Sequence, residues 1–113
     1  MKRIEATIQT TKMSAVSDAI NDIVGGFTIT EGNGRGSGAR QQVRVGRGTG
    51  SITKEYNSVA VVTTIVEDSD VEKVSTAIAD AAFTGKGGDG IIVVTNVDSV
   101  LNIASKKSGS EAL

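Results

Sequence analysis

The chain has 113 residues, the length of one small domain, and 38% of them are hydrophobic, enough for one modest core. A formal net charge of −1 gives no bulk attraction to nucleic acid or membranes. There is no Cys and no His, which excludes disulfides, thiol nucleophiles, the usual zinc or copper ligands and histidine acid–base catalysis. No apolar run reaches transmembrane length and the first residues are too polar for a signal peptide, so we expect a cytoplasmic protein.

The first predicted elements are a strand, a helix and a second strand. Residues 2–9 alternate between apolar and polar side chains, which predicts a strand with one buried face. In residues 12–24 the apolar positions recur every three or four residues, which predicts an amphipathic helix that Gly25 and Gly26 end. From Phe27 onward, alternating Thr and Ile predict the second strand.

The segment from residue 32 to residue 57 has a different composition. Its 26 residues hold seven of the fourteen glycines, and five basic residues against the single acidic Glu55 give a net charge of +4. A loop of this length in a compact domain is usually functional or disordered. Because it lacks the interleaved aromatic residues of a nucleic-acid-binding segment, we expect a mobile loop that docks on a protein partner. An insertion without a role is the alternative.

The second half of the chain repeats the order of the first. Residues 59–67 are nearly all apolar or Thr, which suits a central strand covered on both faces. A helix is predicted to begin at residues 68–72, where Ser69 and Glu72 have the spacing of a capping box. Residues 91–94 form the fourth predicted strand.

This order, β-α-β, long loop, β-α-β, predicts an α+β fold of the ferredoxin-like type. Two helices cover one face of a four-stranded antiparallel sheet, and the whole chain forms one domain. The other sheet face carries aliphatic residues but has no helix to cover it. We therefore expect that face to meet other subunits.

The stretch T-G-K-G-G-D-G, Thr84–Gly90, is the strongest candidate for a binding site. Glycines allow the backbone to turn its N–H groups toward an anion, and Lys86 adds positive charge, so a phosphate site is one interpretation. A helix cap at Gly85 followed by a turn is the other. The chain has no Walker A sequence.

Three further patterns carry weaker signals. Residues 34–39 loosely match a dinucleotide fingerprint, but no helical periodicity follows them. Residues 68–72 resemble the start of a calcium loop, but Lys73 stands where Gly is required, so no metal site is predicted. The pair Lys106-Lys107 in the tail is either a solvated end or a source of charge for a phosphate.

Three stretches together resemble the PII signal-transduction family of nitrogen-regulatory proteins. They are M-K-R-I-E-A-T-I at the N-terminus, F-T-I-T-E-G-N-G-R-G from Phe27, and T-G-K-G-G-D-G from Thr84. The C-terminal G-S-E-A-L is also similar, so the resemblance spans nearly the full length. It identifies residues 84–90 as the family's B-loop, about 32–57 as its T-loop and 104–113 as a C-terminal tail.

The resemblance implies a non-enzymatic regulator. Such proteins are homotrimers of ferredoxin-like subunits that bind an adenine nucleotide, here ATP, ADP or AMP, in clefts between subunits. Their T-loop changes shape with the ligand and engages a protein target. That target would be an ammonium or other transporter, or a metabolic enzyme, with no nucleic acid involved and no insertion into a membrane.

The resemblance also assigns residues to the two functions. The residues expected to bind nucleotide, with Arg35 and the tail lysines added as sources of compensating charge, are Thr28, Gly34, Arg35, Gly36, Thr64, Ile65, Gly85, Lys86, Gly88, Asp89, Gly90, Lys106 and Lys107. The T-loop residues expected to face the partner are Arg40, Arg44, Arg47 and Ser51.

The chain departs from the family pattern at several charged positions. Ile91 stands where a lysine usually follows the B-loop motif, and Asn102 and Ala104 stand in place of two arginines. Ser37-Gly38-Ala39 replaces the T-loop glutamine that helps to hold Mg²⁺ and 2-oxoglutarate, which weakens the expectation of both. Each lost charged hydrogen bond is worth about 1.5–3 kcal/mol, so a changed nucleotide preference is expected.

The sequence alone leaves two alternative functions. One is a structural trimer that has lost its ligand and acts through the loop alone. The other is a slow ATPase, for which the sequence offers no strong general base and no carboxylate pair for Mg²⁺.

Overall fold

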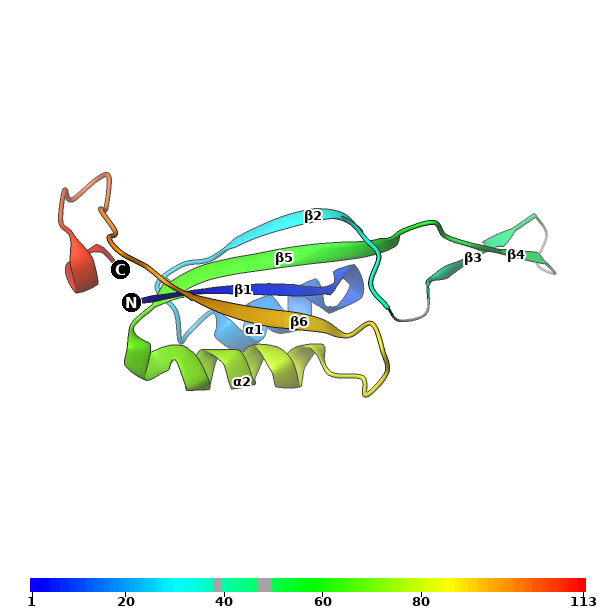
Figure 1. Cartoon of the computed structure of the whole chain (residues 1–113), viewed down its shortest axis with the longest axis horizontal. Helices are drawn as coiled ribbons and strands as arrows, with labels where there is room; N and C mark the ends of the chain where they lie inside the picture. The colour runs from blue at the N-terminus through cyan, green and yellow to red at the C-terminus, as the bar shows by residue number, and fades with distance from the viewer. Residues whose placement is uncertain (38–39, 47–49) are drawn as a thin grey trace.

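The fold is centred on a four-stranded antiparallel sheet (Figure 1). The computed structural model describes residues 1–37, 40–46 and 50–113. The sheet has the order β2-β5-β1-β6, and each strand is antiparallel to its neighbours. Its strands are β1 (Lys2–Gln9), β2 (Thr28–Gly34), β5 (Asn57–Val66) and β6 (Gly90–Asn96). This arrangement confirms the predicted ferredoxin-like topology. Strands β5 and β1 lie at the centre of the sheet.

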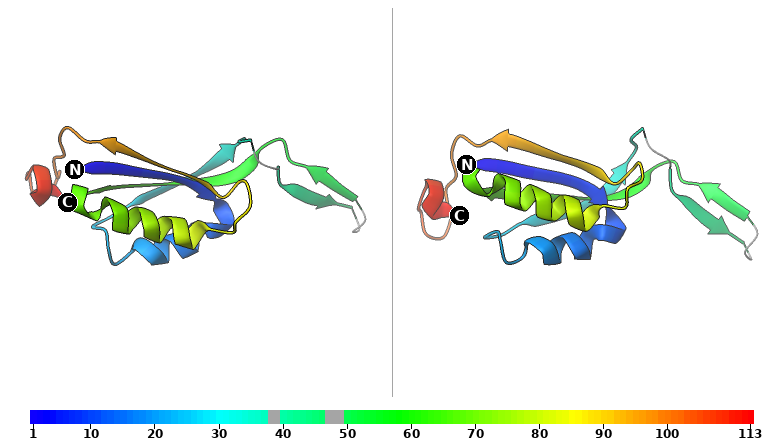
Figure 2. Two further views of the ribbon diagram at one scale, coloured as in Figure 1. Left: turned by 60° about the horizontal axis from the view of Figure 1, so that its bottom comes forward. Right: turned by 90° about the horizontal axis from the view of Figure 1, so that it is seen from below.

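Two helices cover one face of this sheet. They are α1 (Met13–Ile20) and α2 (Val71–Ala82), which contact each other and lie side by side on the same face (Figure 2). The apolar residues of β1 and β5 alternate with polar or outward-facing ones, so one side of each strand meets the helices. The core is aliphatic, and its fully buried large side chains are Ile4, Val16, Ile20, Val62, Val74 and Ile78.

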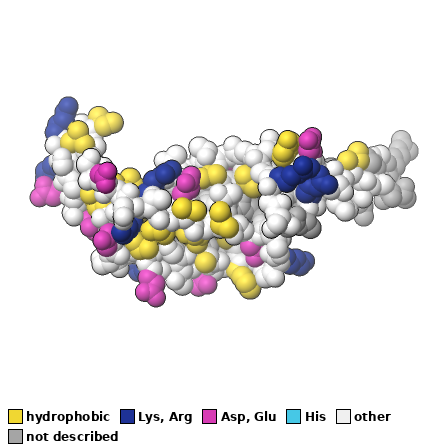
Figure 3. Space-filling model, in the orientation of Figure 1, with side chains coloured by type: hydrophobic (Ala, Val, Ile, Leu, Met, Phe, Trp, Pro, Cys, Tyr) yellow, Lys and Arg dark blue, Asp and Glu magenta, His cyan; other side chains and the backbone are white. Residues whose placement is uncertain are grey.

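The opposite face of the sheet is uncovered in the single chain. From Val59 to Val66 the burial along β5 alternates, so Val59, Val61 and Ile65 remain partly exposed while Ala60, Val62, Thr64 and Val66 are buried. On the edge strand β6, Ile91 and Val93 are exposed. The prediction that β5 is covered on both faces is therefore wrong for one chain, because both helices pack on the same side. Hydrophobic side chains gather over the strands in the middle of the molecule (Figure 3).

A hairpin extends from the end of the sheet. We call residues 35–56 the arm. It contains β3 (Gln42–Val45) and β4 (Gly50–Thr53), which pair antiparallel to each other and to no strand of the main sheet. The arm gives the molecule a long axis of 57 Å and a radius of gyration of 16.8 Å, against about 13 Å for a compact chain of this length. The segment expected to be a mobile loop thus contains regular structure, because two short stretches with strand-like alternation pair with each other.

The helix ends differ from those predicted. The capping box is wrong: Asp68–Asp70 forms a 3-10 turn before α2, and neither the turn nor the helix has a side-chain cap. Asp68 instead forms an ion pair with the Met1 ammonium group, whose nitrogen lies 2.8 Å from Oδ1 of Asp68. The first helix ends at Ile20, before the predicted glycine pair, and α2 ends at Ala82 with the extended Phe83 as its cap, so Gly85 is not a helix cap.

The C-terminal tail folds back on itself. Leu101 and Ser108 form an isolated bridge, and a 3-10 turn (Gly109–Ala112) follows. The side chain of Asn102 organises this return: its Oδ1 accepts hydrogen bonds from the N–H groups of Ala104 and Ser105, and its Nδ2 donates to the carbonyl of Ala112. The family resemblance leads one to expect arginine at this position. Asn102 instead holds the returning tail through these hydrogen bonds.

Thr64 offers a test of how β5 is anchored. Its side chain is buried with the core, and its hydroxyl donates a 2.7 Å hydrogen bond to the carbonyl of Gly26, just before β2. We expect Thr64→Val to lower the free energy of unfolding by about 1 kcal/mol, because the carbonyl loses its donor. Urea unfolding at fixed protein concentration measures it. Thr64→Ser keeps the hydroxyl as a control, and a valine variant as stable as the wild type would contradict this role.

Candidate functional site

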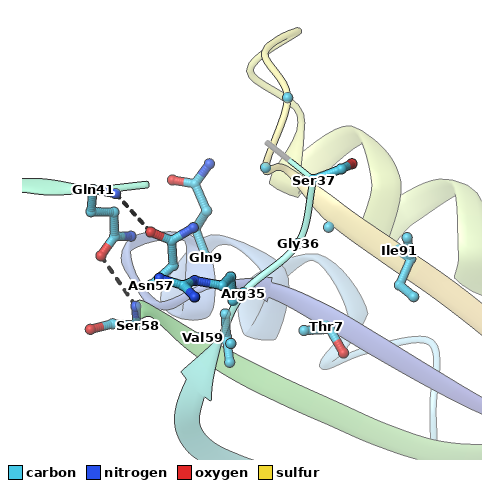
Figure 4. Close-up of a pocket in the computed structure, with 14 residues that line it drawn as sticks. Thr7, Gln9, Arg35, Gly36, Ser37, Gln41, Asn57, Ser58, Val59 and Ile91 are labelled. Atoms are coloured by element: carbon cyan, nitrogen blue, oxygen red, sulfur yellow. Dashed lines mark hydrogen bonds between the residues drawn. The ribbon is translucent and has the colours of Figure 1, made fainter. Parts of the chain in front are cut away.

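A cavity of about 500 Å³ lies where the arm joins the sheet (Figure 4). Four parts of the chain form its wall: the end of β1, the outgoing leg of the arm, the start of β5, and the glycine-rich stretch before β6. The lining residues are Thr7, Gln9, Gly34, Arg35, Gly36, Ser37, Gln41, Asn57, Ser58, Val59, Gly87, Gly88, Gly90 and Ile91. Most of these side chains are polar but uncharged, so backbone and amide groups dominate the wall.

The stretch from Thr84 to Asp89, which we call the glycine loop, is held in shape by its own aspartate. The carboxylate of Asp89 accepts hydrogen bonds from the N–H of Thr84 at 2.7 Å, from the Thr84 hydroxyl, and from the N–H of Gly85 at 2.9 Å. Gln9, which lines the cavity from β1, donates a longer bond of 3.4 Å to the same carboxylate. Asp89 therefore fastens the loop internally and to β1.

Positive φ angles explain why this loop needs glycine. Gly85 has φ +84°, Gly88 has φ +99° and Gly90 has φ +117°, a region that other L-residues rarely adopt. At Gly90 the backbone of β1 also approaches closely: an added Cβ would lie 1.8 Å from the carbonyl oxygen of Thr7. Glycine is thus required at Gly90 both by conformation and by space, and it lets the loop enter β6 directly beside β1.

The hydrogen bonds of Asp89 predict how the loop responds to pH. The Thr84 hydroxyl, then the Thr84 N–H and the Gly85 N–H, with a smaller contribution from the charge of Lys12, hold the pKa of Asp89 below its ordinary value of 3.8. A lowered pKa in the folded state means that the stabilisation is complete above 3.8 and is lost as the pH falls through the lowered value.

We therefore expect the amide resonances of Thr84 and Gly85 to stay constant from about pH 8 to about pH 5 and to shift only in stronger acid. Nuclear magnetic resonance of the labelled protein measures this. A midpoint above the ordinary value of 3.8 would contradict the assigned hydrogen bonds. Asp68, whose pKa is lowered chiefly by its bond to the Met1 ammonium group, reports acid effects elsewhere in the fold.

The base of the arm is closed by contacts between its two legs. Gln41 donates its N–H to Oδ1 of Asn57 at 2.7 Å and accepts the N–H of Ser58 on its side-chain oxygen at 3.2 Å. Its carbonyl accepts the N–H of Lys54 at 2.8 Å. Nearer the sheet, Nε of Arg35 donates to the carbonyl of Glu55 at 3.1 Å. These contacts fix the path of the arm at the cavity wall.

Arg35 makes a second contact at the same place. Its guanidinium carbon lies 5.6 Å from the centre of the Tyr56 ring, within range of a cation–π interaction. Figure 4 shows Arg35 with Gln9, Gln41 and Asn57 on the side of the cavity toward the arm, while Thr7 and Ile91 lie on the other side. Lys and Arg side chains gather at this base of the arm (Figure 3). The cavity thus lies between the glycine loop and the base of the arm.

The structure brings only part of the predicted nucleotide set together. Five of those residues line the cavity: Gly34, Arg35, Gly36, Gly88 and Gly90. Gly85, Lys86 and Asp89 belong to the same loop without lining the cavity, and Lys86 is exposed.

The other predicted residues lie at the opposite end of the molecule. Thr28 begins β2, six residues from Gly34, or about 20 Å along the strand. Thr64 and Ile65 pair with Ile4 and Arg3 near the beginning of β1. The tail with Lys106 and Lys107 lies at the same end, beyond the start of β1, whereas the arm extends from the other end (Figure 1). One chain therefore separates the predicted set into two groups.

Several cavity residues were not predicted from the sequence. They are Thr7, Gln9, Gln41, Asn57, Ser58, Val59 and Gly87, with Ser37 and Ile91 noted only as departures from the family pattern. The alternation of β1 placed Thr7 and Gln9 on the uncovered face, which was a usable signal. Gln41, Asn57 and Ser58 gave none, because their roles depend on how the arm returns to the sheet.

The predicted partner-binding residues are spread along the arm. Arg40 is exposed just before β3, and Arg44 lies on β3. Ser51 lies on β4, where its hydroxyl donates to the Gln42 side-chain oxygen at 3.3 Å. Arg47 lies outside the described residues, as do Gly38 and Ala39.

Two other kinds of site have no candidate in the part of the chain that the structure describes. Neither helix, nor any other helical segment in the described ranges, has the length and apolar composition needed to span a membrane. Among the same residues, no three acidic side chains cluster so that they could hold a metal ion.

Comparison with known proteins assigns the family. Residues 1–107 match the family described as Nitrogen regulatory protein P-II. Over the full length of both chains, the sequence is 34% identical to the Nitrogen regulatory protein P-II of Azospirillum brasilense and 36% identical to that of Microchaete diplosiphon. It is 31% identical to the Nitrogen regulatory protein GlnK2 of Haloferax mediterranei, covering 91% of that protein. The chain belongs to the nitrogen regulatory protein P-II family.

Proposed function

We propose that this protein is a trimeric regulator that binds an adenine nucleotide between subunits and controls a partner protein through its arm. The observation that carries the proposal is the cavity that joins the glycine loop to the base of the arm. A ligand held there contacts both the loop that favours anions and the segment that would meet the partner. Relatives named as regulatory proteins are consistent with a role other than catalysis.

The two separated groups of predicted residues support a shared binding site. The cavity group and the group around Thr28, Thr64 and the tail lie at opposite ends of one chain. A second subunit that packs on the uncovered sheet face would supply the missing group and cover the aliphatic residues exposed there. The site is then complete only in the oligomer.

In this arrangement the glycine loop contributes backbone N–H groups and Arg35 contributes the charge. Backbone amides in glycine-rich turns hold phosphate oxygens, and guanidinium groups pair with them bidentately. Asp89 does not reach the ligand; it keeps the loop in its binding shape through Thr84 and Gly85. A nucleotide controls the arm only through its different affinity for two arm conformations.

The missing charges shape the expected ligand preference. Ile91 is an apolar wall residue of the cavity, and Ser37 contributes only a hydroxyl to it. Asn102 is committed to the turn of the tail. With fewer cations for a triphosphate, we expect ADP or AMP to bind at least as tightly as ATP. A role for Mg²⁺ and 2-oxoglutarate gains no support from these side chains.

Isothermal titration calorimetry of the full-length protein tests this proposal. ATP, ADP, AMP and cyclic AMP are titrated separately, each with and without 2-oxoglutarate. We expect saturable binding of at least one adenine nucleotide. No binding of any of them at millimolar concentration would overturn the nucleotide part and favour the alternative, a trimer that engages its partner without a ligand. Steady phosphate release that Lys86→Ala abolishes would instead indicate an ATPase.

A further inference from the structure

Among the described residues that line the cavity, Arg35 has the only charged side chain. The remaining lining residues carry hydroxyl, amide or aliphatic groups, or are glycines. Within the described part of the chain, Arg35 forms no ion pair with a carboxylate. Its positive charge is therefore not neutralised at the cavity wall, although the side chain has contacts of its own.

Those contacts tie together the two legs of the arm. Arg35 follows β2 on the outgoing leg, whereas Glu55 and Tyr56 precede β5 on the returning leg. The hydrogen bond to the Glu55 carbonyl and the contact with the Tyr56 ring thus hold the legs side by side at the base. Both partners are exposed, and neither carries a negative charge at the contact: one is a neutral carbonyl and the other an aromatic ring.

An anionic group in the cavity would compete for the same guanidinium. An arginine–phosphate pair with two parallel hydrogen bonds is stronger than an exposed cation–π contact or one hydrogen bond to a neutral carbonyl. A phosphate at the cavity wall would therefore draw Arg35 away from the returning leg. The backbone of Gly87 and Gly88, which also line the cavity, can contribute to the same anion.

We propose that Arg35 recognises the phosphate of the bound nucleotide and that its departure from Tyr56 and Glu55 releases the base of the arm. This inference rests on the proposed function and names the residue that couples ligand to arm. Arg35 has two exclusive positions, one on the returning leg and one on the ligand. By linkage, the contacts of Arg35 with Glu55 and Tyr56 weaken ligand binding, and the bound ligand weakens those contacts by the same factor.

Four variants of the full-length protein test the inference by calorimetry with ADP and, as a probe for the phosphate alone, inorganic pyrophosphate. We expect Arg35→Gln to weaken ADP binding about tenfold to a hundredfold. Arg40→Gln is the matched control: it removes the same charge from the same arm but does not line the cavity. We expect it to bind ADP within about twofold of the wild type.

Tyr56→Leu tests the resting position of Arg35. Because it removes the ring that competes for the guanidinium, we expect it to tighten ADP binding about twofold to fivefold. In the double variant Arg35→Gln/Tyr56→Leu the increase in ADP affinity should disappear, because the guanidinium group that Tyr56 holds is no longer present. Thermal unfolding of each variant checks that the fold is intact, as expected for exposed side chains.

The outcomes separate this inference from the proposed function. If the wild type binds ADP and Arg35→Gln binds it no more weakly than Arg40→Gln, the role of Arg35 is overturned and the nucleotide site stands. If Tyr56→Leu has the same effect with and without Arg35, the competition between Tyr56 and the ligand is overturned. If the wild type binds neither ADP nor pyrophosphate, the inference and the proposed function fail together.

Discussion

Gly90→Ala is expected to lower the free energy of unfolding by about 3 kcal/mol or more, because two separate costs add at this position. With φ +117° the backbone lies in a region that alanine rarely adopts. The new Cβ would stand 1.8 Å from the Thr7 carbonyl oxygen and 3.2 Å from the Cα of Ile8. Since Gly90 pairs with Ile8 at the start of β6, the clash would push the edge strand away from β1.

Urea unfolding at fixed protein concentration measures this loss, and two glycine variants separate its causes. Gly88→Ala shares the strain of a positive φ (+99°) but has no atom within 4 Å of the added Cβ. We expect it to cost about 1 kcal/mol. Gly32→Ala on β2 has neither strain nor a close neighbour and should be near neutral. A Gly90→Ala protein as stable as Gly88→Ala would show that β1 and β6 do not approach as closely as described.

Asp89→Asn is expected to weaken nucleotide binding about tenfold to a hundredfold. The N–H groups of Thr84 and Gly85 both donate to Oδ2 of Asp89, and the Thr84 hydroxyl donates to Oδ1. The side-chain amide keeps the size of the carboxylate but has a single acceptor oxygen, so it cannot accept all three bonds. We therefore expect the glycine loop to be less ordered in the free protein. Ordering even one or two of its residues on binding would cost one to two orders of magnitude in affinity.

Calorimetry with the tightest-binding nucleotide measures this effect. Asp80→Asn on the exposed side of α2 is the matched control, because it makes the same change in charge away from the loop. The amide resonances of Thr84 and Gly85 should also move in Asp89→Asn at neutral pH. Unchanged affinity together with unchanged resonances would contradict the role of Asp89 as the fastener of the loop.

Much of the fold could be predicted from the sequence because local patterns and tertiary packing agree. The alternation of residues 2–9 and the apolar run of residues 59–67 became β1 and β5, and the helical stripes became α1 and α2. The prediction failed where local signals compete. The spacing of Ser69 and Glu72 predicted a capping box, which does not form. The start of this helical segment is instead held by an ion pair between Met1 and Asp68, two residues far apart in the sequence. The hairpin of the arm was missed because short polar strands have weak patterns.

The site was predictable to the extent that it depends on the backbone. The glycines at 85, 88 and 90 adopt positive φ, a requirement that glycine-rich sequence signals by itself. The roles of individual side chains were harder to predict from the sequence. Asp89 turned out to bind its own loop, and Thr64 points into the core. The contact of Arg35 with Tyr56 depends on two legs of the arm that lie twenty-one positions apart in the chain and meet only in three dimensions.

Native mass spectrometry with ADP tests directly whether the nucleotide site is shared between subunits, as we propose. We expect a trimer that carries up to one ADP for each subunit interface, while any monomer present carries none. Monomers that retain ADP would contradict the shared site, because one chain keeps its two groups of predicted residues at opposite ends. A protein that stays monomeric at high concentration would contradict it as well.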